Sequence, residues 1–362
     1  MNALSGGVFT GPGTPHTDEL AELRALVDDI GARSAQARVG RRRLPEIFDV
    51  DAWRNLEETG LSRLISDPES GAGPTESAVL LRGLARHAVA VPVAESDLLA
   101  AWLARAAGFR IADTGPLSIA MTDGEMRADR ITGSATGVPW TRSAATVVLA
   151  VRRPGRLLVG TADPHSLSII DGHNLGGEPR DIVEFDLPAD EFTDIDPDYA
   201  DELNRRGAWA RCVQCIGALD SAAELSVAHT RERVQFGRPL SNFQAVQHAL
   251  AQMAGEIERA RAATELAVAA AADYGFGNAR TDYGITVAKV ALGRVVPTVS
   301  TIAHQLHGAI GVTIEHPLWS STNRAHSWID EFGSTGHHAR RLGRIALDAQ
   351  GDTLWDVLTT GP

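Results

Sequence analysis

The sequence contains only two cysteines and no run of 18 or more apolar residues among its 362 positions. Two cysteines allow at most one disulfide, which excludes a small secreted scaffold held together by disulfides. A membrane-spanning helix needs about 20 consecutive apolar residues, so we expect no membrane insertion. Residues 1–17 lack the basic and apolar blocks of a secretory signal, and they are predicted to form a mobile tail. Together these absences predict a cytoplasmic location.

Basic residues are in the minority, because 34 Lys and Arg stand against 46 Asp and Glu, for a formal net charge of −12. Nucleic-acid binding needs a concentrated basic surface, so we expect no nucleic-acid partner. A nucleotide cofactor needs only one or two local arginines or a helix N-terminus at its phosphates. The charge balance therefore does not exclude a flavin or CoA as a ligand.

Cys212 and Cys215 have the C-x-x-C spacing of a redox motif or of half a zinc site. No second pair exists, and both lie in the run from Trp209 to Leu219, which has the composition of a buried helix. Free cysteine is among the most buried residue types. We therefore predict two core residues about one helical turn apart and no metal site.

The spacing of apolar residues divides the chain after its tail into three regions. Helical spacing predicts an N-terminal helical domain over residues 18–114 and a C-terminal helical bundle over residues 199–362. Short β-branched runs bounded by turn signals predict a small β domain over residues 115–198. Its expected strands are Thr146–Val151, Leu157–Thr161, Ser168–Ile170 and Val183–Leu187. The predicted fold class is mainly α with a β insert.

Two features of the C-terminal region refine this prediction. A core stripe of helical period is predicted for one helix and consists of Val246, Leu250, Met253 and Ile257. A second long helix is predicted from Ile285 to His304, and Pro297 is expected to kink or break it.

The segment R-E-R-V-Q-F-G-R-P-L-S-N-F-Q, residues 231–244, carries possible phosphate chemistry. It predicts a helix that ends near Gln235, a turn at Gly237 and Pro239, and a second helix capped by Ser241. Its arginines suit bidentate phosphate contact, and Phe236 suits the face of an adenine or ribose. The alternative is a solvated helix–turn–helix corner whose phenylalanine fills the core.

The segment Q-L-H-G-A-I-G-V-T-I-E-H-P, residues 305–317, is the second candidate. Its small residues Gly308, Ala309 and Gly311 let the backbone approach a ligand closely. Gln305 and His307 add an amide and an imidazole. A tight turn between helices is the alternative, since one Gly-rich loop is weak evidence for phosphate binding.

Taken together, these two segments resemble the C-terminal half of the acyl-CoA dehydrogenase family. The segments from Trp53 to Leu61 and from Pro68 to Gly73 resemble the opening helices of the same family, so the resemblance covers nearly the whole chain. It implies an acyl-CoA dehydrogenase fold, in which an N-terminal helical domain is followed by a β domain and a four-helix bundle.

The resemblance also implies FAD as the cofactor, lying across a subunit interface. In this family one chain holds the adenine and pyrophosphate of the FAD whose flavin belongs to its neighbour. The matching cofactor-binding positions in this sequence are Arg233, Phe236, Leu240, Gln244, Gln305, Gly308, Ala309 and Gly311.

The β domain departs from the family pattern. The loop usually written T-E-P-x-x-G-S-D is shortened here, and the chain passes from Ala120 to Val138-Pro139-Trp140-Thr141 without its G-S-D portion. The family pattern leaves Trp140 and Thr141 as possible flavin neighbours, and the alternative for Trp140 is a core tryptophan at the start of a strand.

The catalytic base is the second departure, because α-proton removal from an acyl-CoA needs a carboxylate. The resemblance puts the usual base at Phe332 and the rarer one, in the preceding helix, at Gly207; neither is acidic. Glu331 lies one residue from the usual position, which rotates a helical side chain by roughly 100°. Glu331 is thus the remaining candidate base, and Asp330 is a weaker one.

This pattern resembles the non-catalytic subunit of actinobacterial steroid-type acyl-CoA dehydrogenases that assemble as α2β2 heterotetramers. It implies a catalytic partner subunit, an acyl-CoA substrate with a bulky steroid-derived acyl group, and an electron-transfer flavoprotein or similar acceptor. The alternatives are a self-sufficient dehydrogenase with Glu331 as base, a flavin monooxygenase on the same fold, and a scaffold subunit without flavin.

Overall fold

The structure is a computed structural model that describes residues 18–40, 43–349 and 355–357, so the predicted tail lies outside the described residues. The described chain forms two compact units. The helical unit draws on residues 18–40, 73–89 and those from 208 onward, and the β unit on residues 43–72 and 90–207.

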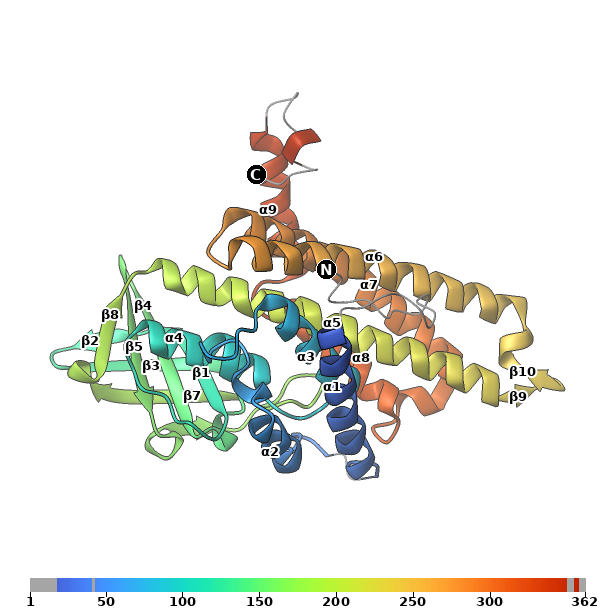
Figure 1. The fold of residues 1–362 in the computed structure, drawn as a ribbon, viewed down its shortest axis with the longest axis horizontal. Helices are drawn as coiled ribbons and strands as arrows, with labels where there is room; N and C mark the ends of the chain where they lie inside the picture. Colours follow the sequence, from blue (N-terminus) through green and yellow to red (C-terminus); the bar gives the residue numbers. More distant parts are fainter. Residues whose placement is uncertain (1–17, 41–42, 350–354, 358–362) are drawn as a thin grey trace. The chain divides into compact units, whose positions relative to one another are not determined.

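The helical unit consists mainly of long helices (Figure 1). Its helices are α1 (Asp18–Ala37), α3 (Pro74–Arg86), most of α5 (Asp198–Glu232), α6 (Gln244–Tyr274), α7 (Ala279–His307), α8 (Pro317–Asp330) and α9 (Thr335–Asp348). Its short elements are the strands β9 (Val234–Gln235) and β10 (Arg238–Pro239) and the 3-10 helices η6 (Leu240–Asn242) and η7 (Gly308–Val312).

Helices α6 and α7 lie side by side in the helical unit (Figure 1). Small residues permit this close packing, because a Cβ added at Gly284 of α7 would lie 3.1 Å from the Cα of Ala267 in α6. Of the predicted stripe on α6, Met253 and Ile257 are buried, while Val246 and Leu250 are half-buried. The stripe therefore enters the core toward the middle of the helix.

The helix boundaries around residues 231–244 differ from the prediction. Helix α5 ends at Glu232, and α6 begins at Gln244 with Phe243 as its N-cap, so the prediction of Ser241 as N-cap is wrong. The residues between them form a β-hairpin and a 3-10 turn, because Phe236 and Gly237 both take a positive φ. Of the two alternatives predicted at Pro297, a kink or a break, the break is wrong, since α7 continues through it.

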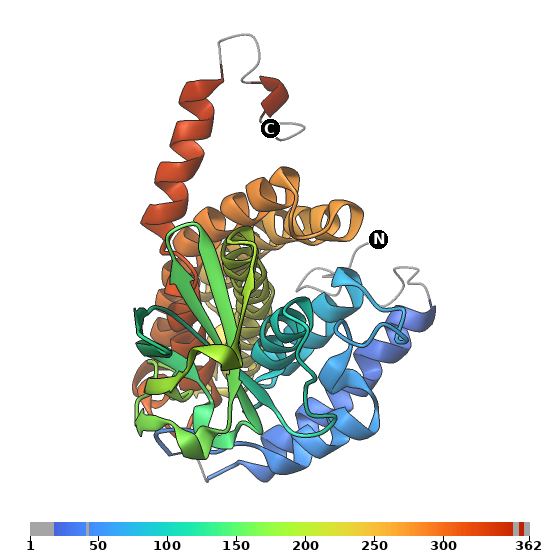
Figure 2. The same ribbon diagram turned by 90° about the vertical axis from the view of Figure 1, so that its left-hand side faces the viewer.

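The distal end of α9 extends away from α6 and α7 (Figures 1 and 2). Leu347 near that end is 85% exposed. By length and composition alone, the segment Ala279–Val312, which includes α7, is apolar enough to cross a membrane, but half of its most apolar stretch is buried inside the structure. Such burial is typical of a core helix of a globular protein.

The β unit contains two four-stranded sheets with the orders β1-β4-β5-β8 and β2-β3-β7-β6. Its strands are β1 (Leu117–Asp123), β2 (Glu125–Arg127), β3 (Arg130–Pro139), β4 (Thr146–Arg153), β5 (Arg156–Ala162), β6 (Ser168–Ile170), β7 (Arg180–Pro188) and β8 (Phe192–Ile195). Strands β1 and β4 pair in parallel, and the other neighbouring strands are antiparallel. All four predicted strands are present.

One apolar cluster joins the two sheets, with members such as Val147 and Leu149 of β4 and Val183 and Phe185 of β7. The alternation of buried and exposed residues along β7 explains why one sheet face is apolar. The unit also contains the helices α2 (Val50–Glu58) and α4 (Trp102–Ala106) and the 3-10 helices η1 (Leu61–Arg63), η3 (Thr141–Ser143), η4 (Pro164–Ser166) and η5 (Ala189–Glu191).

A π-helix, η2 (Ala94–Ala101), precedes α4 and buries three consecutive polar residues. The hydroxyl of Ser96 bonds both backbone groups of Leu117, and the carboxylate of Asp97 accepts hydrogen bonds from the backbone N–H groups of Ile65 and Ser66. These hydrogen bonds join β1 and the loop at residues 65–66 to the π-helix.

Candidate functional site

The hairpin β9–β10 follows directly from the end of α5. Its turn consists of Phe236 and Gly237, with φ of +52° and +78°. Glycine adopts such a conformation readily, whereas a bulky residue at positive φ is strained. Phe236 is in addition 90% exposed. An aromatic residue that is both strained and exposed is typical of a functional position, because backbone strain is found mainly at functional sites.

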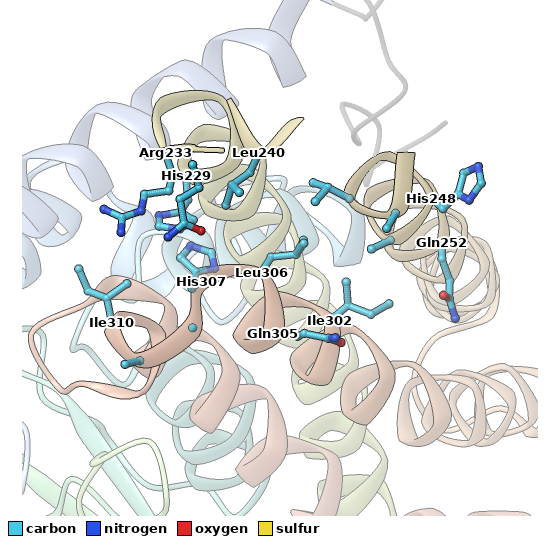
Figure 3. A pocket seen from close by; sticks show the side chains of 16 residues that line it. His229, Arg233, Leu240, His248, Gln252, Ile302, Gln305, Leu306, His307 and Ile310 are labelled. Atoms are coloured by element: carbon cyan, nitrogen blue, oxygen red, sulfur yellow. The ribbon is translucent and has the colours of Figure 1, made fainter. Parts of the chain in front are cut away.

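A cavity of about 860 Å³ lies beside this hairpin in the helical unit (Figure 3). Its walls come from the end of α5, the start of α6, the end of α7 and η7. The hairpin holds one wall in place, because the backbone N–H of Leu240 donates to the carbonyl of Arg233 at 2.9 Å. A volume of this size accommodates a nucleotide-sized ligand.

The structure brings together five of the eight predicted cofactor-binding residues. Those that line the cavity are Arg233, Leu240, Gln305, Gly308 and Ala309. Phe236 projects from the hairpin, Gln244 is exposed at the start of α6, and neither lines the cavity. Gly311 is buried under the loop, where an added Cβ would lie 2.8 Å from the Cβ of His307.

Residues that the sequence did not single out complete the cavity. They include His229, Gln235, His248, Gln252 and Ile302. Of these, His229 has a signal in the sequence, because it precedes Arg233 by four positions, which is about one helical turn. Figure 3 shows His229, His307 and Arg233 on one side of the cavity and His248 and Gln252 on the other.

Imidazole rings cluster on the Arg233 side of the cavity. The ring of His229 stacks on that of His307 with centroids 4.5 Å apart, and His307 meets His316 edge-on at 4.9 Å. Burial lowers the pKa of His229, and the neighbouring His307 and Arg233 lower it further. The free cavity thus disfavours a protonated imidazole at this position.

The cavity has two features that suit a phosphate-bearing ligand. Arg233 is exposed at its edge and offers a guanidinium for a phosphate. A Cβ added at Gly308, where φ is +64°, would meet no atom within 4 Å, so the backbone there is open to an approaching group. Arg233, Leu240, Gln305, Gly308 and Ala309 would hold the adenine and pyrophosphate part of FAD.

The candidate base Glu331 lies in the helical unit but is engaged in an ion pair. Its carboxylate accepts a hydrogen bond of 2.6 Å from Nε of Arg211, whose side chain is only 2% exposed. The backbone carbonyl of Glu331 accepts a second bond, of 2.7 Å, from the buried Lys289. Both contacts fix the segment that follows α8.

Phe332, at the position where the resemblance puts the usual base, lies next to the same arginine. Its φ is +56°, and the guanidinium of Arg211 lies 5.7 Å from the centre of its ring. The neighbouring Lys289 donates to the carbonyls of Trp328, Ile329 and Glu331, and burial lowers its pKa. The buried cations of Arg211 and Lys289 thus hold the segment that follows α8 in place.

The remaining residues considered from the sequence are buried. Cys212 and Cys215 are free thiols with less than 2% exposure, as predicted, and burial raises the pKa of Cys212 to about 12. Trp140 is 2% exposed in the β unit, where its ring lies 6.3 Å from that of Phe48. Thr141 is fully buried.

The C-terminal part of the chain, residues 200–351, matches the family model described as "Acyl-CoA dehydrogenase, C-terminal domain". The acyl-CoA dehydrogenase IpdE2 of Mycobacterium tuberculosis is 28% identical over 345 residues, which are 90% of this chain and 96% of that protein. IpdE2 of Mycolicibacterium smegmatis is 31% identical over 127 residues, which are 35% of this chain and only 38% of that protein.

Two solved structures share the fold across the chain. The ChsE4-ChsE5 complex from Mycobacterium tuberculosis matches with a TM-score of 0.79 and 22% identity, over 93% of this chain and 99% of the other. The Tcur3481-Tcur3483 steroid ACAD G363A variant matches with a TM-score of 0.76 and 25% identity, over 92% and 99%.

The C-terminal part of the chain, residues 200–351, belongs to the acyl-CoA dehydrogenase family, and the similarity to IpdE2 extends over 90% of the chain. These similarities confirm the predicted fold class and the predicted oxidoreductase class. The solved steroid ACAD among the similar structures agrees with the resemblance to steroid-type members of the family.

Proposed function

We propose that this chain is the non-catalytic subunit of an FAD-dependent acyl-CoA dehydrogenase and assembles with a catalytic subunit as an α2β2 heterotetramer. It supplies the adenine and pyrophosphate half of an FAD site at the subunit interface. The partner subunit supplies the carboxylate that removes the α-proton of the acyl-CoA. The complex works in the cytoplasm and passes electrons to an electron-transfer flavoprotein or a similar acceptor.

The ion pair between Arg211 and Glu331 is the observation that carries this proposal. A general base has to accept a proton, and a protonated Glu331 would leave the guanidinium of Arg211 buried without its counter-charge. An uncompensated buried charge is strongly unfavourable, so this carboxylate is poorly suited to act as the base. The family position beside it holds Phe332, which has no acidic group.

The cavity next to the hairpin supports the other half of the proposal. FAD, when bound, supplies the acceptor for the hydride that leaves the β-carbon of the acyl-CoA. This chain's contribution is binding: Arg233 holds phosphate, Gly308 and Ala309 admit it to the backbone, and Gln305 offers an amide. Phe236, strained and exposed, is presented to the partner subunit at the same ligand.

The similar proteins support the proposed substrate class and the proposed assembly. One similar structure is the ChsE4-ChsE5 complex. Another is a steroid ACAD whose name joins two designations, Tcur3481 and Tcur3483. Together they favour a CoA thioester of a bulky steroid-derived acid and a heteromeric assembly for this chain as well.

Flavin content of the chain with and without a catalytic subunit tests the proposal. The chain purified alone is expected to retain far less than one FAD per chain, because it offers only the adenine side of the site. Co-expression with the catalytic subunit should yield a complex with a flavin absorption spectrum that acyl-CoA bleaches anaerobically without NADH. A homo-oligomer with one tight FAD per chain would instead establish a self-sufficient enzyme, and a requirement for NADH would favour a monooxygenase.

A further inference from the structure

The histidine pair at the cavity edge has a chemistry that the cofactor-binding residues above do not explain. His229 is half-buried on the last turn of α5, and its ring stacks on the buried ring of His307 at the end of α7. The two rings are 24° from parallel. His229 and Arg233 both line the cavity from the end of one helix, so an anion held by the arginine also meets the imidazole.

The hydrogen bonding of His307 fixes the character of the ring behind His229. Its Nδ1 donates to the carbonyl of Ala303 at 2.8 Å, because a carbonyl oxygen only accepts. Its Nε2 is buried and has no hydrogen-bond partner among the described residues. In the neutral ring this nitrogen carries a lone pair and no proton, so a neutral His307 places no full positive charge against His229.

Charged and titratable groups near His229 and its partner His307 come from four helices. Arg233 repels a proton on His229 and Glu232, also from α5, attracts it. Helix α7 contributes His304 and His307, α8 begins beside His316, and α6 presents His248 across the cavity. Arg233 is the only fixed cation among these residues, and an anion bound to it would cancel its repulsion.

We propose that His229 binds the diphosphate of an adenine dinucleotide alongside Arg233 and takes up a proton as the ligand enters, with His307 as the residue that positions its ring. The inference rests on the proposed function, since it assigns a second anion-binding group to the same cavity. It makes His229 a binding residue and couples occupancy of the cavity to pH.

The direction of this coupling follows from proton linkage. Burial lowers the pKa of His229 in the free chain below 6.5, and the neighbouring His307 and Arg233 lower it further. A bound diphosphate opposes both effects and raises the pKa of His229 in the complex. Binding is therefore tightest below the pKa of the free chain and weakens as the pH rises through the pKa of the complex.

Calorimetric titration of the purified chain with ADP-ribose tests this inference. ADP-ribose contains adenine and a diphosphate diester but no flavin, and none of its own groups titrates between pH 5.5 and 8.5. Titrations in buffers with different ionisation enthalpies give the number of protons taken up. We expect up to one proton per ligand, and an affinity that falls by up to about tenfold per pH unit within the window.

Three variants separate the possible results. His229→Gln is expected to bind more weakly and without proton uptake, whereas His229→Arg should bind with an affinity independent of pH. His248→Gln is the matched control, because it removes an imidazole from the same cavity outside the stacked pair, and it should keep the proton uptake. His307→Phe keeps a stacked ring but removes the imidazole that lowers the pKa of His229 in the free chain, so it should reduce the uptake without abolishing binding.

The failures of the two proposals are distinguishable. Binding of ADP-ribose with no proton uptake, or with uptake that persists in His229→Gln, would overturn this inference and leave the proposed function intact. Absence of ADP-ribose binding at every pH would contradict the proposed function itself, together with the inference that depends on it.

Discussion

Arg211 and Glu331, separated by 120 positions in the sequence, form a 2.6 Å ion pair in which the arginine side chain is 2% exposed and the glutamate side chain 22%. The guanidinium also donates to the amide oxygen of Gln214 at 2.6 Å. Both partners are therefore structural, because Arg211 needs a counter-charge inside the protein and Glu331 supplies it where α8 ends.

The first prediction concerns the stability of this pair. Glu331→Gln should lower the free energy of unfolding by about 1–3 kcal/mol, because it leaves a buried guanidinium without its counter-charge. The double variant Arg211→Met, Glu331→Leu should recover most of that loss, since it removes both charges. Urea unfolding of Arg211→Met, Glu331→Leu and the double variant measures the coupling. Losses that simply add would show that the pair contributes no interaction energy.

Phe236 carries the second prediction. Asparagine tolerates positive φ better than phenylalanine does, so Phe236→Asn should leave the stability of the isolated chain unchanged or raise it by about 0.5–1 kcal/mol. The same change should lower flavin retention and partner binding in the assembled complex. A thermal unfolding curve and a flavin measurement on the same two samples suffice. A destabilised chain with normal flavin content would show that Phe236 has only a structural role.

The third prediction concerns Arg233. Arg233→Lys keeps the charge but loses the planar fork that contacts a phosphate with two N–H groups. Flavin retention by the assembled complex should fall several-fold, while helix content measured by circular dichroism stays the same. Arg231→Lys is the matched control, because Arg231 is exposed two positions earlier and does not line the cavity. Equal flavin content in both variants would contradict a phosphate contact at Arg233.

The sequence predicted the fold well where local patterns determine it. The β-branched runs at Thr146 and Leu157 became β4 and β5, because strand period and turn residues are both local properties. The π-helix at Ala94 was not predictable, since its apolar residues are compatible with an ordinary helix and its hydrogen bonds depend on distant partners such as Leu117.

The candidate site was predictable only in part. Motif resemblance singled out Arg233 and Gln305, which lie on the same cavity. It did not find His229, whose importance depends on a ring stacked from another helix. Nor did it find Arg211 as the partner of Glu331, because a pair separated by 120 positions leaves no trace in local spacing. Ser241 failed as a cap because two residues with positive φ turned the chain into a hairpin first.

The fourth prediction concerns acid stability and His338. Burial lowers the pKa of His338 to about 4, so the unfolded chain, whose histidine titrates near 6.5, binds a proton before the folded chain does. The free energy of unfolding therefore falls as the pH falls from about 6.5 to about 4. His338→Gln should reduce that loss by about 1 kcal/mol after allowance for solvent screening. Urea midpoints at pH 7 and 4.5 measure it, with His165→Gln, at an exposed histidine far from His338 in the sequence, as the control that should change nothing.

The last prediction tests whether this chain carries its own catalytic base. In the assembled complex, Glu331→Gln should leave acyl-CoA-dependent flavin reduction nearly intact, because the partner's carboxylate removes the α-proton. If Glu331 were the base, the amide would be unable to accept that proton, and rates should fall by about 10²–10⁴-fold. The stability cost expected from the loss of the Arg211 pair calls for rapid-mixing measurements well below the unfolding midpoint, with bound FAD determined in the same sample.

A complementary variant separates a displaced base from an absent one. Phe332→Glu restores a carboxylate at the position where most of the family has it, but residue 332 has φ of +56° and its side chain lies beside Arg211. A carboxylate placed there would pair with the same guanidinium and compete with Glu331, so we expect no gain in flavin reduction by the complex. A large rate loss in Glu331→Gln with FAD content unchanged, or a rate gain in Phe332→Glu, would show that this chain contains a working active site and that its assignment as the non-catalytic subunit is wrong.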